Sequence, residues 1–306
     1  PPLSAAHVEL QTFLLDHRPS ALPNGAKDTS RVVFPDGLAY DGQVRLFDGM
    51  PHGWGSVILP DGINYEGSWF SGRVHGRGTL RLPNGNSYWG SWAYGRKHGR
   101  GTFLWADGSR HDGLYRAGKR KGVGTLLYAS GAMFEGEFED DLRHGVGRLE
   151  LPSGSWYDGQ WVKDVPHGFG VFVGPGRWGE RYEGSWERGV RCGGGRLVQG
   201  GGEERGVNEG AGGNEDAAWY SGNFEEGLPH GDGMMGYGAM TYCGHVEHGE
   251  WTGGGGRLDL GAGLGSFEGM WRDGLPTGSG SWCYVQTGVE EDCTFKEGHS
   301  KLMWPR

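Results

Sequence analysis

A repeat of about 23 residues runs through most of this 306-residue chain and limits the folds that it can adopt. An aromatic residue or His, an acidic or small residue and then Gly recur as YDG at 40, YEG at 65, YWG at 88, HDG at 111, FEG at 134, YDG at 157 and YEG at 182. The pattern continues less regularly as YSG at 220, EHGEW at 247, FEGMW at 267 and EDCTF at 291. About eleven copies of one structural unit are therefore expected.

Each copy has a second half at a fixed offset from the first. It reads HGWG from His52, HGRG from His75 and His98, KGVG from Lys121, HGVG from His144, HGFG from His167 and HGDG from His230. A turn such as PDG at 60 or PNG at 83 then closes the unit. Two short alternating runs separated by Gly-containing turns are typical of a β-hairpin, so the sequence predicts an all-β fold with one hairpin per repeat.

Alternation along these strands predicts one face made of aromatic rings and Gly. In the repeat at 65, Tyr65, Gly67 and Trp69 share a face of the first strand, and Gly76 and Gly78 share a face of the second. The composition agrees, with 65 Gly, 14 Trp, 12 Tyr and 12 Phe. Because Gly leaves room for a ring to lie flat, we expect a ring of a neighbouring hairpin to cover each Gly.

The unit resembles the MORN repeat, which reads roughly YEGEWxNGxxHGxGxxxxPDG, and the resemblance covers residues 28 to about 298. It implies an elongated, twisted single-layer antiparallel sheet of stacked β-hairpin repeats. RCGGG replaces HGxG after Gly189, and a Gly-rich and Glu-rich segment then interrupts the period. We expect regular repeats over 28–197, a mobile insert over 198–218, and degenerate repeats with a C-terminal tail over 219–306.

Residues 1–27 are expected to form a short N-terminal helix and a linker. Ser4 is a suitable N-cap, and Pro19 lies beyond the end of the helix. Four apolar residues share one helical face and are the expected docking residues: Leu3, Leu10, Phe13 and Leu14. The helix either caps the first hairpin or docks on a partner, and capping is the favoured interpretation.

The motifs that resemble catalytic or metal sites fit the repeat better than they fit chemistry. GDGMMG at 231–236 satisfies GxGxxG but lies inside a predicted hairpin, without the strand and helix that hold a pyrophosphate. HVEH at 245–248 lacks two further zinc ligands nearby, and the four scattered Cys indicate free thiols. We expect a protein that is not an enzyme and has no cofactor and no metal.

Charge predicts a binding edge. The formal net charge of -9 argues against nucleic-acid binding. Basic residues nevertheless recur at equivalent places in successive repeats, where they are expected to form one edge that binds an acidic protein tail or anionic lipid: Arg73, Arg77, Arg96, Lys97, Arg100, Lys119, Arg120, Lys121 and Arg143. The alternative, solvated turn residues without a partner, stays open.

The C-terminal hairpins are expected to pair with a second copy of the chain or with another MORN protein, because the last strand of a sheet leaves an unpaired edge. Trp282, Tyr284 and Trp304 are the expected assembly interface. Trp271 and Phe295 are expected to complete the apolar face of their repeat instead.

The resemblance also implies a choice of roles. MORN repeats are building blocks of ciliary and flagellar axonemes, notably radial spoke heads, and of other cytoskeletal scaffolds; they also occur in membrane tethers and as appendages of lipid kinases and SET-domain methyltransferases. Our first expectation is a scaffold of the cytoplasm and cytoskeleton, within the axoneme, that binds axonemal or cytoskeletal proteins. The alternatives are a tether with weak affinity for anionic phospholipid, or the regulatory MORN module of a larger enzyme.

Overall fold

Each repeat folds as two antiparallel strands, since its alternating residues suit a sheet and some of its Gly residues occupy the turns. The computed structural model describes residues 29–34, 38–176, 179–200, 217–261, 263–284 and 289–295. These residues form strands, turns and bends, and no helix occurs among them. No membrane-spanning helix is therefore found in the part of the chain that is described.

The chain divides into two units, Pro1–Gly147 and Arg148–Arg306. Unit 1 contains β1 (Thr29–Val33), β2 (Ala39–Val44), β3 (Pro51–Ile58), β4 (Asn64–Phe70), β5 (Arg73–Arg81), β6 (Ser87–Ala93), β7 (Arg96–Leu104), β8 (Arg110–Arg116), β9 (Lys119–Leu127) and β10 (Met133–Glu139). The division falls within β11 (Leu142–Glu150). Unit 2 contains β12 (Trp156–Val162), β13 (Val165–Val173), β14 (Arg181–Glu187), β15 (Val190–Gln199), β16 (Ala218–Glu225), β17 (Leu228–Tyr237), β18 (Met240–Glu247), β19 (Glu250–Asp259), β20 (Ser266–Arg272), β21 (Leu275–Tyr284) and β22 (Val289–Phe295).

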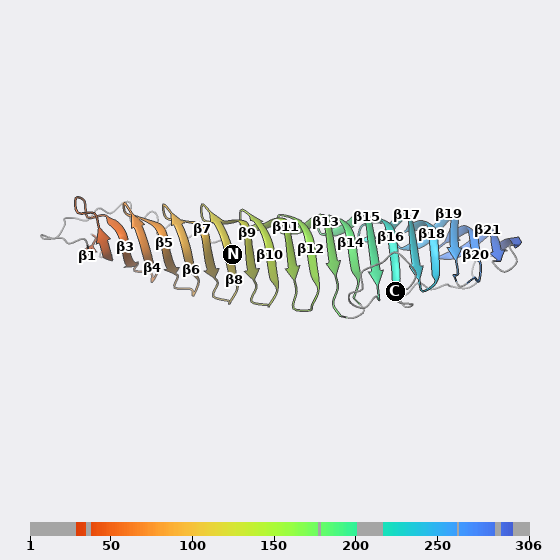
Figure 1. The fold of residues 1–306 in the computed structure, drawn as a ribbon, viewed down its shortest axis with the longest axis horizontal. Helices are drawn as coiled ribbons and strands as arrows, with labels where there is room; N and C mark the ends of the chain where they lie inside the picture. The colour runs from red at the N-terminus through yellow and green to blue at the C-terminus, as the bar shows by residue number, and fades with distance from the viewer. Residues whose placement is uncertain are drawn as a thin grey trace. The chain divides into compact units, whose positions relative to one another are not determined.

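Every strand from β1 to β9 pairs antiparallel with the next one, and so does every strand from β12 to β21 (Figure 1). Each unit is thus a succession of hairpins in one layer. The predicted all-β, antiparallel, single-layer sheet of hairpin repeats is confirmed within each unit. The predicted N-terminal helix and residues 201–216 of the predicted insert lie outside the described residues.

The strand register of unit 1 aligns one Gly from each strand. Gly67 pairs with Gly78, Gly78 with Gly90, and Gly90 with Gly101. The same pairing joins the neighbouring strands, and together these residues form what we call the glycine row: Gly55, Gly67, Gly78, Gly90, Gly101, Gly113 and Gly124. A line of residues without side chains therefore crosses β3 to β9.

Aromatic rings cover one side of the glycine row. An ideal Cβ on Gly78 would lie 2.2 Å from the hydroxyl oxygen of Tyr65, and one on Gly101 would lie 2.2 Å from that of Tyr88. The predicted ring and Gly face is confirmed here. The covering ring, however, belongs to the same hairpin as the Gly and not to a neighbouring one, because Tyr65 and Gly78 lie on the paired strands β4 and β5.

Gly76 does not belong to this face, contrary to the sequence-based assignment. The register between β4 and β5 shifts between Gly67 and Trp69, which places Gly76 in a bulge with φ of 74°. A Cβ there would lie 3.0 Å from Cβ of Ser68. Simple alternation fails across a bulge because extra residues on one strand lack partners on the other.

Trp side chains join consecutive hairpins. The ring of Trp92 lies edge-on to Tyr88 of its own hairpin, at 5.1 Å between centroids, and to Tyr65 of the preceding hairpin, at 5.6 Å. Its Nε1 donates a hydrogen bond to the carbonyl oxygen of Gly78 at 3.2 Å. All three rings are buried. These edge-to-face contacts each contribute about 0.5–1.5 kcal/mol beyond area burial, so the hairpins stabilise one another.

The turn inside each hairpin also contacts the hairpin before it. Tyr94 and Gly95 both have positive φ, as a two-residue type I′ turn requires. The N–H of Gly95 donates to the carbonyl oxygen of Val74 at 2.7 Å, and the N–H of Gly118 donates to the backbone carbonyl oxygen of Lys97 at 2.9 Å. We call this side of unit 1 the turn edge; it comprises residues 45–50 and the turns at 71–72, 94–95 and 117–118.

Candidate functional site

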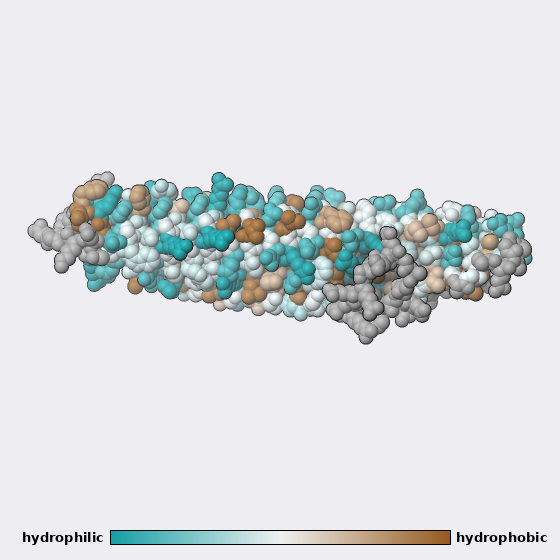
Figure 2. Space-filling model, viewed as in Figure 1, coloured by the Kyte–Doolittle hydropathy of each residue, from teal (hydrophilic) through white to brown (hydrophobic). Residues whose placement is uncertain are grey.

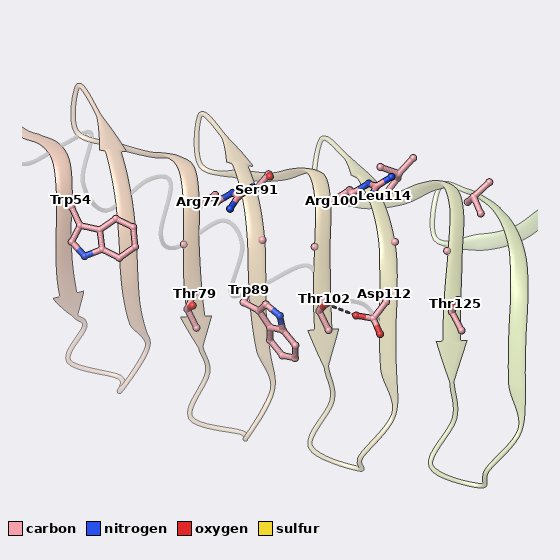
Figure 3. Close-up of a pocket in the computed structure, with 16 residues that line it drawn as sticks. Trp54, Arg77, Thr79, Trp89, Ser91, Arg100, Thr102, Asp112, Leu114 and Thr125 are labelled. Carbon is pink, nitrogen blue, oxygen red and sulfur yellow. Dashed lines mark hydrogen bonds between the residues drawn. The ribbon is translucent and has the colours of Figure 1, made fainter.

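A groove with a volume of about 760 Å³ crosses the strands of unit 1 (Figure 3). Its floor is formed by five members of the glycine row: Gly78, Gly90, Gly101, Gly113 and Gly124. Because neighbouring residues of a strand point to opposite faces, the side chains that line it lie on the face opposite the buried rings. We call it the transverse groove.

Two rows of side chains flank the floor. Arg77 and Thr79, for example, lie on either side of Gly78 in β5. One rim is formed by Trp54, Arg77, Ser91, Arg100, Leu114 and Val123. The other is formed by Thr79, Trp89, Thr102, Asp112 and Thr125. Figure 3 shows side chains of both rims on successive strands. The groove therefore has a backbone floor and a repeating, mixed polar and aromatic border.

Two cations and two partly exposed indoles lie on the rims, and the guanidinium carbon of Arg110 lies 5.8 Å from the ring centroid of Trp89. Arg77 and Arg100 are exposed, and neither forms an ion pair or hydrogen bond through its side chain with the described residues. Trp54 is 52% exposed and Trp89 is 40% exposed. Exposed indoles are unusual enough on a sheet face to indicate a contact surface.

The one carboxylate that lines the groove, Asp112, is already ion-paired with Arg110. The Nε of Arg110 lies 2.6 Å from Oδ2 of Asp112, and the hydroxyl of Thr102 donates to Oδ1. Partial burial alone would raise the pKa of Asp112, but the hydrogen bonds from Arg110 and Thr102 and the Arg110 charge hold it below its usual value. Asp112 therefore does not cancel the charges of Arg77 and Arg100.

The nine basic residues predicted to form one edge are not brought together. Arg73, Arg96 and Lys119 begin β5, β7 and β9 beside the turn edge and are exposed. Arg77 and Arg100 lie on the rim of the transverse groove. The remaining four, Lys97, Arg120, Lys121 and Arg143, contact rings or carboxylates of unit 1.

Lys97 was predicted to lie on the exposed basic edge, but it is only 1% exposed. Its Nζ lies 4.6 Å from the ring centroid of Phe103, 5.1 Å from Tyr115 and 5.6 Å from Tyr88, in favourable cation–π positions. No hydrogen-bond partner for Nζ occurs among the described residues. Burial lowers the pKa of Lys97 to about 8; the Asp141 charge opposes this shift. Lys97 is therefore part of the core.

Arg120 and Lys121 already have acidic partners within unit 1. The Nε of Arg120 lies 3.4 Å from Oδ1 of Asp141, which also accepts a hydrogen bond from the Arg120 backbone N–H at 2.9 Å. Lys121 pairs with Glu139. Lys119 is exposed but lies 3.7 Å from Oδ1 of Asp140, so the exposed cations of the predicted set without an acidic partner among the described residues are Arg73, Arg77, Arg96 and Arg100.

His111 occupies a position that Tyr holds in most repeats. It is fully buried, and its Nδ1 lies 2.8 Å from the hydroxyl oxygen of Tyr115. Burial, followed by the Arg120 charge, lowers the pKa of His111 to about 3, although Asp112 opposes the shift. His111 is therefore neutral at pH 7. The repeat pattern predicted only one more repeat residue here, although HDG in place of YEG was a visible signal.

Exposed aromatic residues also lie at the turn edge and were not predicted from the repeat pattern. Phe47 is 79% exposed, Phe70 is 47% exposed and Tyr94 is 57% exposed. The ring of His75 packs between Phe70, at 5.7 Å, and Tyr94, at 4.9 Å. Phe70 pairs with Arg73 across the turn, and Tyr94 lies two residues before Arg96. Figure 2 shows hydrophobic groups among hydrophilic ones on the face in view.

At the C-terminal end, the predicted interface residues have different environments. Trp282 is partly buried and stacks on Phe267 at 6.4 Å, whereas Tyr284 is 42% exposed. Trp271 is buried in the repeat face, as expected. Two of the predicted C-terminal positions, Trp304 and the side chain of Phe295, lie outside the described residues. The same holds for the predicted helix residues Leu3, Leu10, Phe13 and Leu14.

The His residues near HVEH pair with carboxylates. His245 Nδ1 lies 2.9 Å from Asp232, and His230 Nε2 lies 3.1 Å from Glu225. Within the described ranges, no group of three or more His, Cys, Asp or Glu side chains is placed to hold a metal ion. All four Cys are free thiols.

Stacked hairpins with an aromatic core and a groove across their outer face define a β-hairpin repeat protein of the scaffold or membrane-binding class. The MORN-repeat family matches the chain at 65–87, 88–110, 111–133, 134–156, 157–176, 182–202, 220–239 and 267–286, which is more than half of its length. The chain therefore belongs to the MORN-repeat family. Hairpins β2–β3 and β18–β19 pair in the same way, although they lie outside the matched ranges.

Similarity to solved structures is weak. The TCP domain of Drosophila melanogaster SAS-4, in complex with a proline-rich motif of Ana2, is 12% identical, with a TM-score of 0.32 over 61% of this chain and 92% of that one. The TCP10 domain of Danio rerio CPAP, in complex with a STIL peptide, is 14% identical, with a TM-score of 0.23 over 50% of this chain and 77% of that one. These TM-scores are too low to support an argument. No curated protein matches the chain significantly.

Proposed function

We propose that the chain is a non-enzymatic structural scaffold that holds a segment of a partner protein in the transverse groove. The observation that carries this proposal is the juxtaposition of exposed Trp54 and Trp89 with unpaired Arg77 and Arg100 over a floor of backbone. Trp and Arg are enriched in protein interfaces and dominate their energetics. A flat sheet face without a binding role has no need of two exposed indoles.

The chemistry of the groove supports binding more than catalysis. Neither His nor Cys is among the residues that line it, and its carboxylate is held by Arg110 and Thr102. A general base needs a free lone pair within reach of a substrate proton. Asp112 is occupied on both oxygens, so it is poorly suited to that role.

The site of action that we propose is a ciliary or flagellar axoneme, with the radial spoke head as the first candidate, or a related cytoskeletal complex. MORN-repeat membership supports this location by family analogy. The partners are then axonemal or cytoskeletal proteins, including other MORN proteins.

The test expresses the tagged full chain in ciliated cells and compares it with the double variant Trp54→Ala, Trp89→Ala. Proximity labelling should recover axonemal proteins with the unchanged chain and lose them with the variant. Phe169→Ala, which removes another exposed ring, from β13 in unit 2, is the matched control and should retain them. A diffuse distribution, or labelling that does not depend on the groove, would contradict the proposal.

Membrane tethering is a second candidate function, favoured by the turn edge. Exposed Phe70 pairs with the cation Arg73 across the turn, and exposed Tyr94 lies two residues before the cation Arg96. The ring of exposed Phe47 lies 4.7 Å from the guanidinium carbon of Arg45. Aromatic rings insert at the membrane interface, and cations beside them are attracted to anionic headgroups. This surface is distinct from the transverse groove, so substitutions separate the two functions.

A further inference from the structure

The spacing of the groove residues defines the partner more narrowly. Trp54, Arg77, Arg100 and Val123 occupy equivalent positions on β3, β5, β7 and β9 of one rim. Successive members are two strands apart, which is about 9.6 Å at the usual strand separation. The rim therefore offers an aromatic residue, two cations and an aliphatic residue at equal intervals.

A polyproline II segment has a matching period. It rises about 3.1 Å per residue with three residues per turn, so side chains three residues apart point the same way at a spacing of about 9.3 Å. An extended β-strand repeats every two residues, about 6.7 Å, which fits the rim poorly. The match requires no movement of the hairpins.

The width of the groove also argues against a helix. The two rims are two residues apart along each strand, for example at Arg77 and Thr79, which is a separation of about 6.7 Å between backbones. An α-helix with side chains is about 10–12 Å across and would rest on the rims without reaching the floor. A polyproline II segment is narrower and exposes its backbone carbonyls, which suits a groove bordered by Thr and Ser hydroxyls.

The charges then specify the ligand. Arg77 and Arg100 lack acidic partners among the described residues, while Asp112 on the other rim is paired with Arg110. Trp54 and Trp89 offer the aromatic surfaces on which proline rings pack in grooves of this kind. We propose that the transverse groove binds a proline-rich acidic segment of a partner protein in the polyproline II conformation, with carboxylates three residues apart facing Arg77 and Arg100.

This inference rests on the proposed function, because it names the segment that the scaffold holds. The test uses the full chain and two fluorescent peptides of identical composition, each rich in proline. One has Glu at positions i and i+3, and the other has Glu at i and i+2. Fluorescence anisotropy should show tighter binding of the first peptide by about fivefold or more, because only its carboxylates reach both guanidinium groups.

The matched variants differ only in the location of the charge change. Arg77→Glu with Arg100→Glu should weaken binding of the i, i+3 peptide by about tenfold or more. Arg73→Glu with Arg96→Glu alters the same strands and the net charge equally but lies at the turn edge, and it should change affinity by less than about twofold. Equal melting temperatures of the two variants would show that both fold.

Four results would overturn the inference. Equal binding of both peptides would show that the three-residue period of polyproline II does not determine affinity. Equal effects of the two double variants would show that the attraction between chain and peptide is non-specific. Binding of phosphatidylserine vesicles that depends on Arg77 and Arg100 would assign the groove to lipid. If neither peptide binds but the partner is still lost on Trp54→Ala with Trp89→Ala, then the scaffold function stands and the ligand chemistry alone is wrong.

Discussion

The hydroxyl oxygen of Tyr65 lies almost where the Cβ of residue 78 would be: an ideal Cβ on Gly78 falls 2.2 Å from it. The hydroxyl donates to the carbonyl oxygen of Ser68 at 3.1 Å, so the ring is held at both ends. The same contact recurs between Tyr88 and Gly101. Gly78 and Gly101 are thus required by packing, not by a special backbone angle, since neither has positive φ.

The first prediction tests this packing. Gly78→Val should lower the free energy of unfolding by roughly 1–3 kcal/mol, because the new side chain displaces the Tyr65 ring. Thr79→Val, on the opposite face, is the control and should have little effect. Urea or thermal unfolding measures both. In a Tyr65→Leu background the cost of Gly78→Val should shrink; an unchanged cost would show that the ring is not the obstacle.

The hairpin and the ring face could be predicted from the sequence because both follow from local alternation. Tyr65 and Trp69 lie on the predicted face and are buried. The Gly76 assignment failed because a bulge in β5 at residues 75–77, opposite Ser68, breaks the alternation, and a bulge has no signal in a period-2 pattern. Register, not composition, decides such positions.

The candidate site was less predictable. Arg77 and Lys97 were grouped because both precede or follow an HG motif, yet one lines the groove and the other is buried. Their faces depend on strand parity, which the sequence shows, and on the space between rings, which it does not. The transverse groove itself depends on the alignment of Gly across strands, so it became visible only with the register.

The second prediction concerns Lys97. Its pKa is about 8 in the folded chain, below its ordinary value of 10.5, so the unfolded chain binds more protons between these values and stability rises with pH there. The unfolding free energy should therefore increase by about 2 kcal/mol between pH 7 and 9.5 relative to Lys97→Met. Above pH 10 tyrosine ionisation in the unfolded chain interferes. Parallel pH profiles of the two proteins would contradict the burial of a charged Lys97.

The third prediction concerns His111. Its pKa is about 3 in the folded chain and 6.5 ordinarily, so the unfolded chain takes up a proton first as pH falls, and stability is lost from pH 6.5 downward. His111→Tyr with Tyr115→Trp recreates the pair seen at Tyr88 and Trp92. The original protein should lose about 2 kcal/mol more than this variant between pH 7 and pH 5. Identical losses in chemical denaturation would show that His111 does not titrate as described.

The fourth prediction separates membrane binding from peptide binding. Vesicles containing phosphatidylserine should retain the chain weakly at physiological salt and more strongly at low salt. Arg73→Glu with Arg96→Glu, or Phe47→Ser with Phe70→Ser, should release it in sedimentation assays. Arg77→Glu with Arg100→Glu is the control of equal charge. If that control releases the chain as well as the turn-edge variants do, the membrane surface is not the turn edge.

The last prediction is self-association through the C-terminal hairpins. Within the described residues β22 pairs with β21 alone, and Tyr284, the last residue of β21, is 42% exposed. A strand with one partner offers its other edge to a second chain, and an exposed ring beside it adds apolar contact. Light scattering over a concentration series should show a dimer that Tyr284→Glu weakens. Leu264→Glu, at a residue that is 63% exposed between β19 and β20, should leave the dimer intact. A monomer at every concentration, with and without a second MORN protein, would rule out this interface, and equal weakening by both substitutions would place it elsewhere.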